Sequence, residues 1–72
     1  MKTINLFENS YCFSSIETKV NVSESFIEYS LAKQYEYRPT TESLWATVTE
    51  NGKEIARYEL IYGKGLFQIE LN

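Results

Sequence analysis

The sequence contains no histidine, no aspartate, one cysteine and one proline, and each shortage argues against a class of function. General acid–base catalysis near neutral pH usually relies on histidine. A disulfide within the chain needs two cysteines, and Cys12 is alone. A zinc site needs a cluster of cysteine and histidine, whereas the only acidic residues are ten scattered glutamates. We therefore expect a protein with no catalytic residues, no metal and no cofactor.

Three short motifs could suggest chemistry, but each lacks a necessary part. Cys12 has no histidine that could activate it as a nucleophile. The segment 63–65, Gly-Lys-Gly, lacks the spacing of a phosphate-binding loop and is better explained as a turn. The pair Ser14-Ser15 has no general base near it in the sequence. A small enzyme or ligand carrier remains an alternative, which a pocket lined by converging glutamates would favour.

Length and charge indicate the class of protein. With 72 residues, of which 43% are hydrophobic, the chain predicts a single small domain over residues 1–72 with a real core. The net charge of −3 disfavours direct binding to nucleic-acid phosphates. No apolar run is long enough to span a membrane, and residues 1–10 lack the features of a signal peptide. Together with the lone cysteine, these features lead us to expect a cytoplasmic protein.

The first half of the chain predicts a β-hairpin followed by a helix. Residues 2–7 form a plausible first strand, and residues 16–22 alternate as a half-buried strand does, with a bulge expected at Ser14-Ser15. Ser23 is a suitable N-cap for a helix over about residues 23–37 that buries Ile27 and Leu31. Pro39 should end this helix.

The last third predicts a three-stranded antiparallel β-meander over about residues 43–50, 53–62 and 65–71. Asn51-Gly52 is the leading signal for a two-residue hairpin turn, and Gly63-Lys64 predicts a second. The fold class is therefore α+β, in the order ββαβββ. These turns place one set of side chains beneath the helix: Trp45, Thr47, Ala56, Tyr58, Leu60, Tyr62, Phe67, Ile69 and Leu71.

The opposite face of the meander is then unusually apolar for a surface in contact with water. It would carry Arg57 beside Glu70 and Glu59 beside Gln68. Its apolar members would be Leu44, Ala46, Val48, Ile55, Ile61 and Leu66. Either the N-terminal hairpin or another chain should cover this face, so a homodimer through it or through a sheet edge is one expectation.

The end of the helix is the predicted partner-binding site. Tyrosine and arginine are enriched in the energetic centres of protein interfaces, and acidic neighbours favour a basic partner surface. The predicted site comprises Glu28, Tyr29, Glu36, Tyr37 and Arg38. The alternative is that the tyrosines pack over the edge of the sheet with their hydroxyls in water.

The function expected from these features is a non-catalytic protein-binding module. In size, acidity and composition the chain resembles small inhibitors made by phages and mobile elements, including anti-CRISPR proteins, although no family motif carries the resemblance. The expected partner is a protein or a protein–nucleic acid complex. The alternative is a nucleic-acid-binding protein that uses aromatic side chains of the sheet or the helix end. The predicted position of those aromatics, beneath the helix, argues against this alternative.

Overall fold

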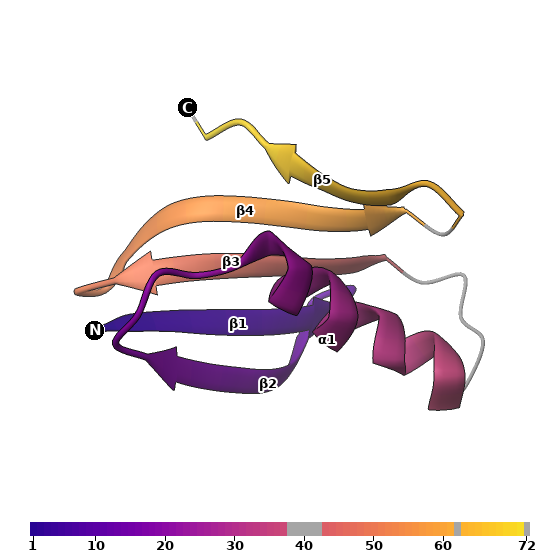
Figure 1. Cartoon of the computed structure of the whole chain (residues 1–72), viewed down its shortest axis with the longest axis horizontal. Helices are drawn as coiled ribbons and strands as arrows, with labels where there is room; N and C mark the ends of the chain where they lie inside the picture. The colour runs from indigo at the N-terminus through magenta and orange to yellow at the C-terminus, as the bar shows by residue number, and fades with distance from the viewer. Residues whose placement is uncertain (38–42, 62, 72) are drawn as a thin grey trace.

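The protein folds as one helix against five antiparallel strands, which confirms the α+β prediction and its ββαβββ order (Figure 1). The computed structural model describes the backbone of residues 1–37, 43–61 and 63–71, and the side chains of these residues except 34–37. The elements are β1 (Lys2–Glu8), β2 (Tyr11–Thr18), α1 (Glu24–Tyr37), β3 (Leu44–Glu50), β4 (Lys53–Ile61) and β5 (Gly65–Ile69).

All five strands belong to one sheet with the order β2-β1-β3-β4-β5. The N-terminal hairpin therefore joins the C-terminal meander, because β1 pairs with β3 along its whole length, from Lys2 opposite Glu50 to Glu8 opposite Leu44. This contact places β1 and β3 in the middle of the sheet and leaves β2 and β5 as its two edges. The sequence did not show whether the hairpin would join this sheet.

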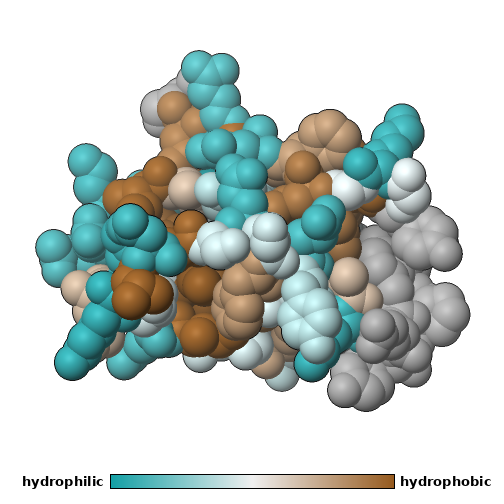
Figure 2. Space-filling view, viewed as in Figure 1, coloured by the Kyte–Doolittle hydropathy of each residue, from teal (hydrophilic) through white to brown (hydrophobic). Residues whose placement is uncertain are grey.

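The core lies between α1 and one face of the sheet. Ile27 and Leu31 on α1 are fully buried, as their spacing predicts. The sheet contributes its even-numbered side chains to this face: Ile4, Leu6, Leu44, Ala46, Val48, Tyr58 and Leu60. Figure 2 shows this side of the molecule, with hydrophobic surface still visible beside the helix. We call the sheet surface beneath α1 the helix face and the opposite surface the open face.

The boundaries of α1 follow from residues at its two ends. The carbonyl of Ser23 accepts a hydrogen bond from the Ile27 amide at 3.2 Å, which closes the first turn. Glu24 stands at the positive end of the helix dipole. Pro39 itself lies outside the described residues, and the helix ends at Tyr37, as predicted from the proline.

The turn between β1 and β2 is hydrogen-bonded to the residue that precedes β3. Asn9 adopts a positive φ of 54°, which asparagine tolerates better than most residues. Its amide donates to the Ser43 carbonyl at 2.7 Å, and its side-chain oxygen accepts from the Ser43 amide at 3.1 Å.

The β1–β2 hairpin carries a bulge near the predicted place, at Phe13 rather than at Ser14-Ser15. Phe13 is the residue without a direct partner, because Ser14 lies opposite Leu6 and Cys12 opposite Phe7.

The β3–β4 hairpin has the predicted turn but a different register beyond it. Asn51 and Gly52 both have positive φ, 53° and 79°, and Glu50 lies opposite Lys53 as expected. A β-bulge then follows at Ile55, so Val48 faces Ala56 and Trp45 faces Glu59. The prediction that Trp45 and Thr47 point beneath the helix with Tyr58 is therefore wrong. Leu44, Ala46 and Val48 take that position instead. These three and Leu66, which were predicted to face outward, belong to the core or pack against it, whereas Ile55 and Ile61 are exposed as predicted.

The β4–β5 connection is one residue longer than the predicted two-residue turn. Ile61 lies opposite Gly65, and the Lys64 amide donates to the Ile61 carbonyl at 2.9 Å, with Gly63 at a φ of 82°. The shift turns β5 over, so Phe67 and Ile69 lie on the open face and Leu66 lies beneath α1. Arg57 consequently faces Ile69 and Glu59 faces Phe67, rather than Glu70 and Gln68. Leu71 lies beyond the end of β5, and Tyr62 lies outside the described residues.

Candidate functional site

The structure describes only part of the predicted helix-end site. Glu28 and Tyr29 are exposed on α1, and Tyr29 keeps 59% of its surface accessible. The ammonium group of Lys33 lies 4.7 Å from the centre of the Tyr29 ring, one helical turn away. Glu36 and Tyr37 belong to the last turn of α1, while Arg38 lies outside the described residues. The helix-end site therefore stays a prediction.

Glu28 points toward the β4–β5 connection rather than along the helix toward the predicted tyrosines. Its carboxylate approaches Gly65 so closely that a Cβ on that glycine would lie 3.3 Å from the oxygen. Glu28 also lines a surface hollow of about 510 Å³ with Leu60, Ile61 and Lys64. The acidic group thus sits near the first residue of β5, on the helix side of the sheet.

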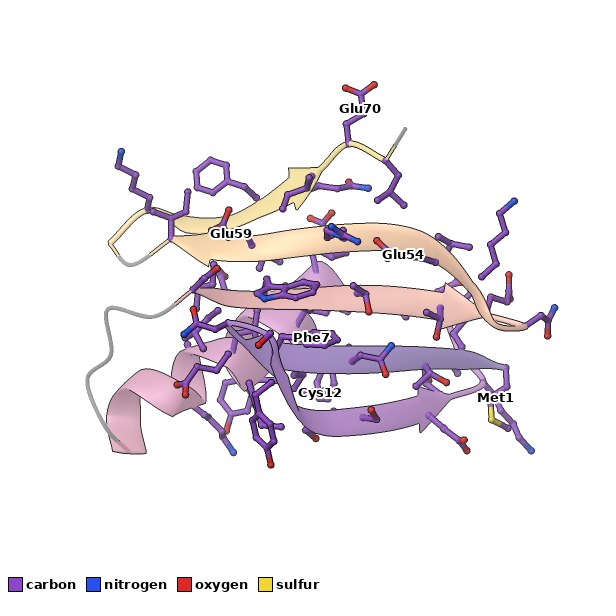
Figure 3. All side chains as sticks on the ribbon, turned by 180° about the vertical axis from the view of Figure 1, so that it is seen from behind. Met1, Phe7, Cys12, Glu54, Glu59 and Glu70 are labelled. Atoms are coloured by element: carbon purple, nitrogen blue, oxygen red, sulfur yellow. The ribbon has the colours of Figure 1, made fainter. Side chains whose placement is uncertain are left out.

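The open face is the more complete candidate surface, because all of its strands are described and no helix covers it (Figure 3). Its side chains form rows that cross the sheet at right angles to the strands, as the strand register requires. The first row contains Cys12, Phe7, Trp45, Glu59 and Phe67. The second contains Ser15, Asn5, Thr47, Arg57 and Ile69.

Trp45 is held on the open face from both sides of its ring. The Phe7 ring stacks on the indole with centroids 4.0 Å apart and an interplanar angle of 9°. The Arg57 guanidinium lies over the ring at 5.4 Å from its centroid, and it comes from β4, on the other side of β3 from Phe7. The indole N–H donates to the Asn9 carbonyl. Both faces of the indole are therefore occupied within the protein.

Polar contacts organise the second row. The Ser15 hydroxyl donates to the Asn5 side-chain oxygen at 2.9 Å, and the Asn5 amide donates to the Thr47 hydroxyl at 3.1 Å. Thr47 is 6% exposed, although it lies on the side away from the helix. Such a chain of bonds satisfies polar groups that the neighbouring aromatic side chains partly shield from water.

The bulge at Ile55 brings Arg57 and Glu54 together on the open face. In a regular strand, residues three apart point to opposite faces, and the extra residue removes this difference. The Arg57 Nε and Nη2 atoms donate to the two Glu54 oxygens at 2.8 and 2.9 Å. The hydrogen bond from Arg57 lowers the pKa of the Glu54 carboxyl. Sequence spacing alone gave no sign of this pair.

Beyond the aromatic stack, the open face ends in a group of exposed apolar side chains. Ile61 on β4 and Phe67 and Ile69 on β5 keep 40%, 47% and 36% of their surfaces accessible. They are neighbours, since Phe67 and Ile69 are two residues apart and Ile61 lies diagonally across from Phe67. Glu59 stands between this group and Trp45. We call Ile61, Phe67 and Ile69 the open-face patch.

The described residues offer little for catalysis or for a metal. Cys12 is exposed, and its sulfur lies 3.4 Å from the Ser14 carbonyl oxygen and 3.6 Å from the Ser15 hydroxyl. Among the residues that the structure describes, no group of three or more cysteine, histidine, aspartate or glutamate side chains could hold a metal ion. Three surface hollows of about 300, 350 and 510 Å³ each include a single glutamate in their lining.

Comparison of the chain with protein-family models, with curated proteins and with solved structures found no match. In the part of the chain that the structure describes, α1 is not long and apolar enough to cross a membrane.

The sequence did contain a signal for the open-face patch. In residues 44–49 the even positions are Leu, Ala and Val, whereas the odd positions are Trp, Thr and Thr. The purely aliphatic set indicates the buried side, and the predicted face was assigned from the tryptophan instead. With Leu44 inward, Trp45 has to point outward. The bulge and the longer turn then place Phe67 on the same face and in the same row, with Glu59 between the two aromatic residues.

Proposed function

We propose that this protein is a small, acidic, non-catalytic protein-binding module that covers a surface of a larger partner. The observation that carries the proposal is the open-face patch, where Ile61, Phe67 and Ile69 form a continuous apolar surface that no other described element covers. Neighbouring apolar side chains on an uncovered face are typical of contact sites. Glu59 beside the patch and the net charge of −3 favour a partner with basic groups around an apolar centre.

The role of an inhibitor of a host macromolecular complex, of the kind made by phages or mobile elements, is part of this proposal and rests on size, acidity and composition. A cytoplasmic location is also part of it and is supported by the unpaired, exposed Cys12. The partner is either a protein or a protein–nucleic acid complex.

Affinity capture with matched variants tests which surface binds. The variant Phe67→Thr with Ile69→Thr removes the apolar surface and keeps residues that favour strands. We expect it to remain folded by circular dichroism and to lose the partner that wild type captures. Val20→Thr is the matched control, because Val20 is 71% exposed and lies in the β2–α1 connection, outside the open-face patch. Equal capture by all three proteins would contradict the proposed contact surface.

The predicted helix-end site is tested in the same assay. We expect Tyr37→Ala and Arg38→Ala to leave the protein folded and to weaken capture, since tyrosine and arginine often dominate interface energies. If these two variants capture the partner as wild type does while the open-face variant fails, binding belongs to the open face alone.

Binding of single-stranded nucleic acid is the second candidate, because Trp45, Phe7 and Phe67 lie in one row on the open face. Trp45 and Phe67 were predicted to lie beneath the helix, and for these two residues the prediction is wrong. Two observations still weigh against this function. Both faces of the indole are occupied, so the Trp45 ring has no free face on which a base could stack. On this face the strands carry three glutamates and one arginine, because Glu17 and Glu54 lie in a further row beside that of Arg57, and this excess of negative charge repels phosphates.

Fluorescence anisotropy with labelled single-stranded DNA and RNA at low salt decides between the two candidates. We expect no saturable change at micromolar protein. A saturable change that Phe67→Ala abolishes would favour the nucleic-acid function over the protein-binding one.

A further inference from the structure

β5 is an edge strand with an unpaired side. It is hydrogen-bonded to β4 alone, and Figure 1 shows no other element beyond it. Its five residues, Gly-Leu-Phe-Gln-Ile, include no charge and no proline, and its register with β4 runs without a bulge. Proteins usually protect an edge strand with charges, proline, bulges or a covering segment, because its free backbone groups can pair with another strand.

The opposite edge of the sheet is protected in two of these ways. β2 is interrupted by the bulge at Phe13, which breaks the regular spacing of its free backbone groups. It also carries Glu17, and Lys19 follows it directly. Of the two edges, β5 is the one that remains regular and uncharged.

The apolar side chains of β5 extend to this free edge. Phe67 and Ile69 lie on the open face, about half and one-third exposed, and the half-buried Leu66 lies on the helix face. A strand that added to β5 would therefore meet apolar side chains on both faces of the extended sheet. Burial of these side chains would stabilise the strand pair in addition to its backbone hydrogen bonds.

The charges that flank β5 indicate which strand would fit. Lys64 precedes β5 and Glu70 follows it, so each lies three residues from the central Phe67. Both side chains are exposed, and neither forms an ion pair with another described residue. Glu70 projects from the end of β5 away from β4 (Figure 3).

These features are self-complementary in one arrangement. If two copies of β5 pair antiparallel about a two-fold axis at Phe67, Lys64 of each copy lies opposite Glu70 of the other. A shift of one residue in either direction places Lys64 opposite Ile69 or Leu71 and leaves both charges without a counter-ion. Opposite charges directly across an antiparallel pair stabilise it, so this register is favoured over its neighbours.

We propose that two copies of this chain associate through β5 in this register and form a continuous ten-stranded sheet, in which Lys64 and Glu70 pair at both ends of the new contact. A five-residue strand pair is a small interface, so the dimer forms reversibly and its population depends on protein concentration. The two open-face patches then adjoin across the axis. The proposal deepens the protein-binding function by naming one partner, a second copy.

Reversal of the charges tests the proposal in the full chain. Sedimentation equilibrium over a range of protein concentrations gives the dimer dissociation constant. Lys64→Glu alone and Glu70→Lys alone each place like charges opposite one another twice, and we expect each to raise this constant by about ten-fold or more. Lys64→Glu combined with Glu70→Lys restores both pairs in reverse, so we expect it to recover the wild-type value.

Lys53→Glu is the matched control for Lys64→Glu, because it makes the same change in net charge at the exposed first residue of β4, at the opposite end of β4 from the β4–β5 connection. We expect it to leave the dissociation constant unchanged. Amide hydrogen exchange gives an independent readout: protection should rise with protein concentration in residues 65–69 and not in β2.

A chain that stays monomeric at every concentration overturns the proposal. So does a dimer in which the double charge reversal fails to rescue the single variants, because that result excludes this register. Neither outcome decides whether the protein captures a different partner, because the charge variants leave Ile61, Phe67 and Ile69 in place. Failure of the dimer and failure of the protein-binding function are thus distinguishable.

Discussion

The two faces of the sheet differ in the kind of side chain they carry and in what holds those side chains in place. The helix face is aliphatic and closely packed, with Leu44 and Ala46 fully buried beneath Ile27 and Leu31. The open face carries the only tryptophan, which is fixed by a ring stack, a cation and one hydrogen bond. Side-chain size therefore does not indicate the core here, and a large aromatic residue can organise a surface that faces water.

The largest effect is expected from a truncation on the helix face. Leu44→Ala removes a fully buried side chain and leaves a cavity beneath α1, so we expect it to lower the free energy of unfolding by about 2–5 kcal/mol. Urea denaturation followed by circular dichroism measures the change. A loss below about 1 kcal/mol would contradict the close packing of Leu44 on the helix face.

A truncation on the open face should have a smaller effect, even though it removes a larger side chain. Trp45→Ala loses the Phe7 stack and the indole hydrogen bond to Asn9, and we expect a loss of about 1–3 kcal/mol. Trp45→Phe keeps an aromatic ring and should recover part of this loss. If Trp45→Ala proves more destabilising than Leu44→Ala, the contrast between the two faces is overturned.

The helix face also contains one group whose ionisation should destabilise the fold. Burial raises the pKa of the Tyr58 phenol, and the nearby Glu24 carboxylate raises it further. The folded state thus favours the neutral phenol, so its contribution to stability is present below the ordinary tyrosine pKa and is lost as the pH rises through the raised value. We expect the urea midpoint to fall in strong alkali and this fall to be smaller in Tyr58→Phe.

The smallest effect is expected from the ion pair on the open face. Because Arg57 lowers the pKa of Glu54, the pair contributes stability above the ordinary glutamate pKa and loses it as the pH falls through the lowered value. The Arg57 and Glu54 side chains are 40% and 28% exposed, so solvent weakens the attraction. We expect Glu54→Gln to flatten the acid limb of the stability curve slightly, with no change at neutral pH beyond about 0.5 kcal/mol.

The order of elements was predicted correctly from the sequence, whereas the sheet faces to which the side chains of β3 and β5 point were not. The Asn51-Gly52 turn and the spacing of Ile27 and Leu31 depend on neighbouring residues alone, and both were confirmed. The facing of β3 depends on a bulge at Ile55, and no residue type marks that position. One extra residue moves every side chain beyond it to the other face of the sheet. The turn was therefore predicted correctly, while the side chains of β3 were assigned to the wrong face.

The candidate site was missed for the same reason. Phe67 and Ile69 were assigned to the core because the β4–β5 connection was taken as two residues, and one more residue moves both to the open face. The helix-end site was predicted from residue types that are common in protein interfaces. A residue type indicates that a side chain can bind a partner well, but it does not indicate where that side chain lies in the fold. Glu28 illustrates the difference, because its carboxylate approaches Gly65 at the edge of the sheet.

The pairing of β1 with β3 has a consequence for the speed of folding. Glu8 meets Leu44 only after β2, α1 and the segment that follows have been drawn into a closed loop, and the entropy of that closure has to be overcome before the contact stabilises anything. The β1–β2 and β3–β4 hairpins can each form within microseconds, but the pairing of β1 with β3 joins strands that lie far apart in the sequence. We expect the pairing of β1 with β3 to set the folding rate, in the slow regime typical of proteins whose contacts are distant in sequence.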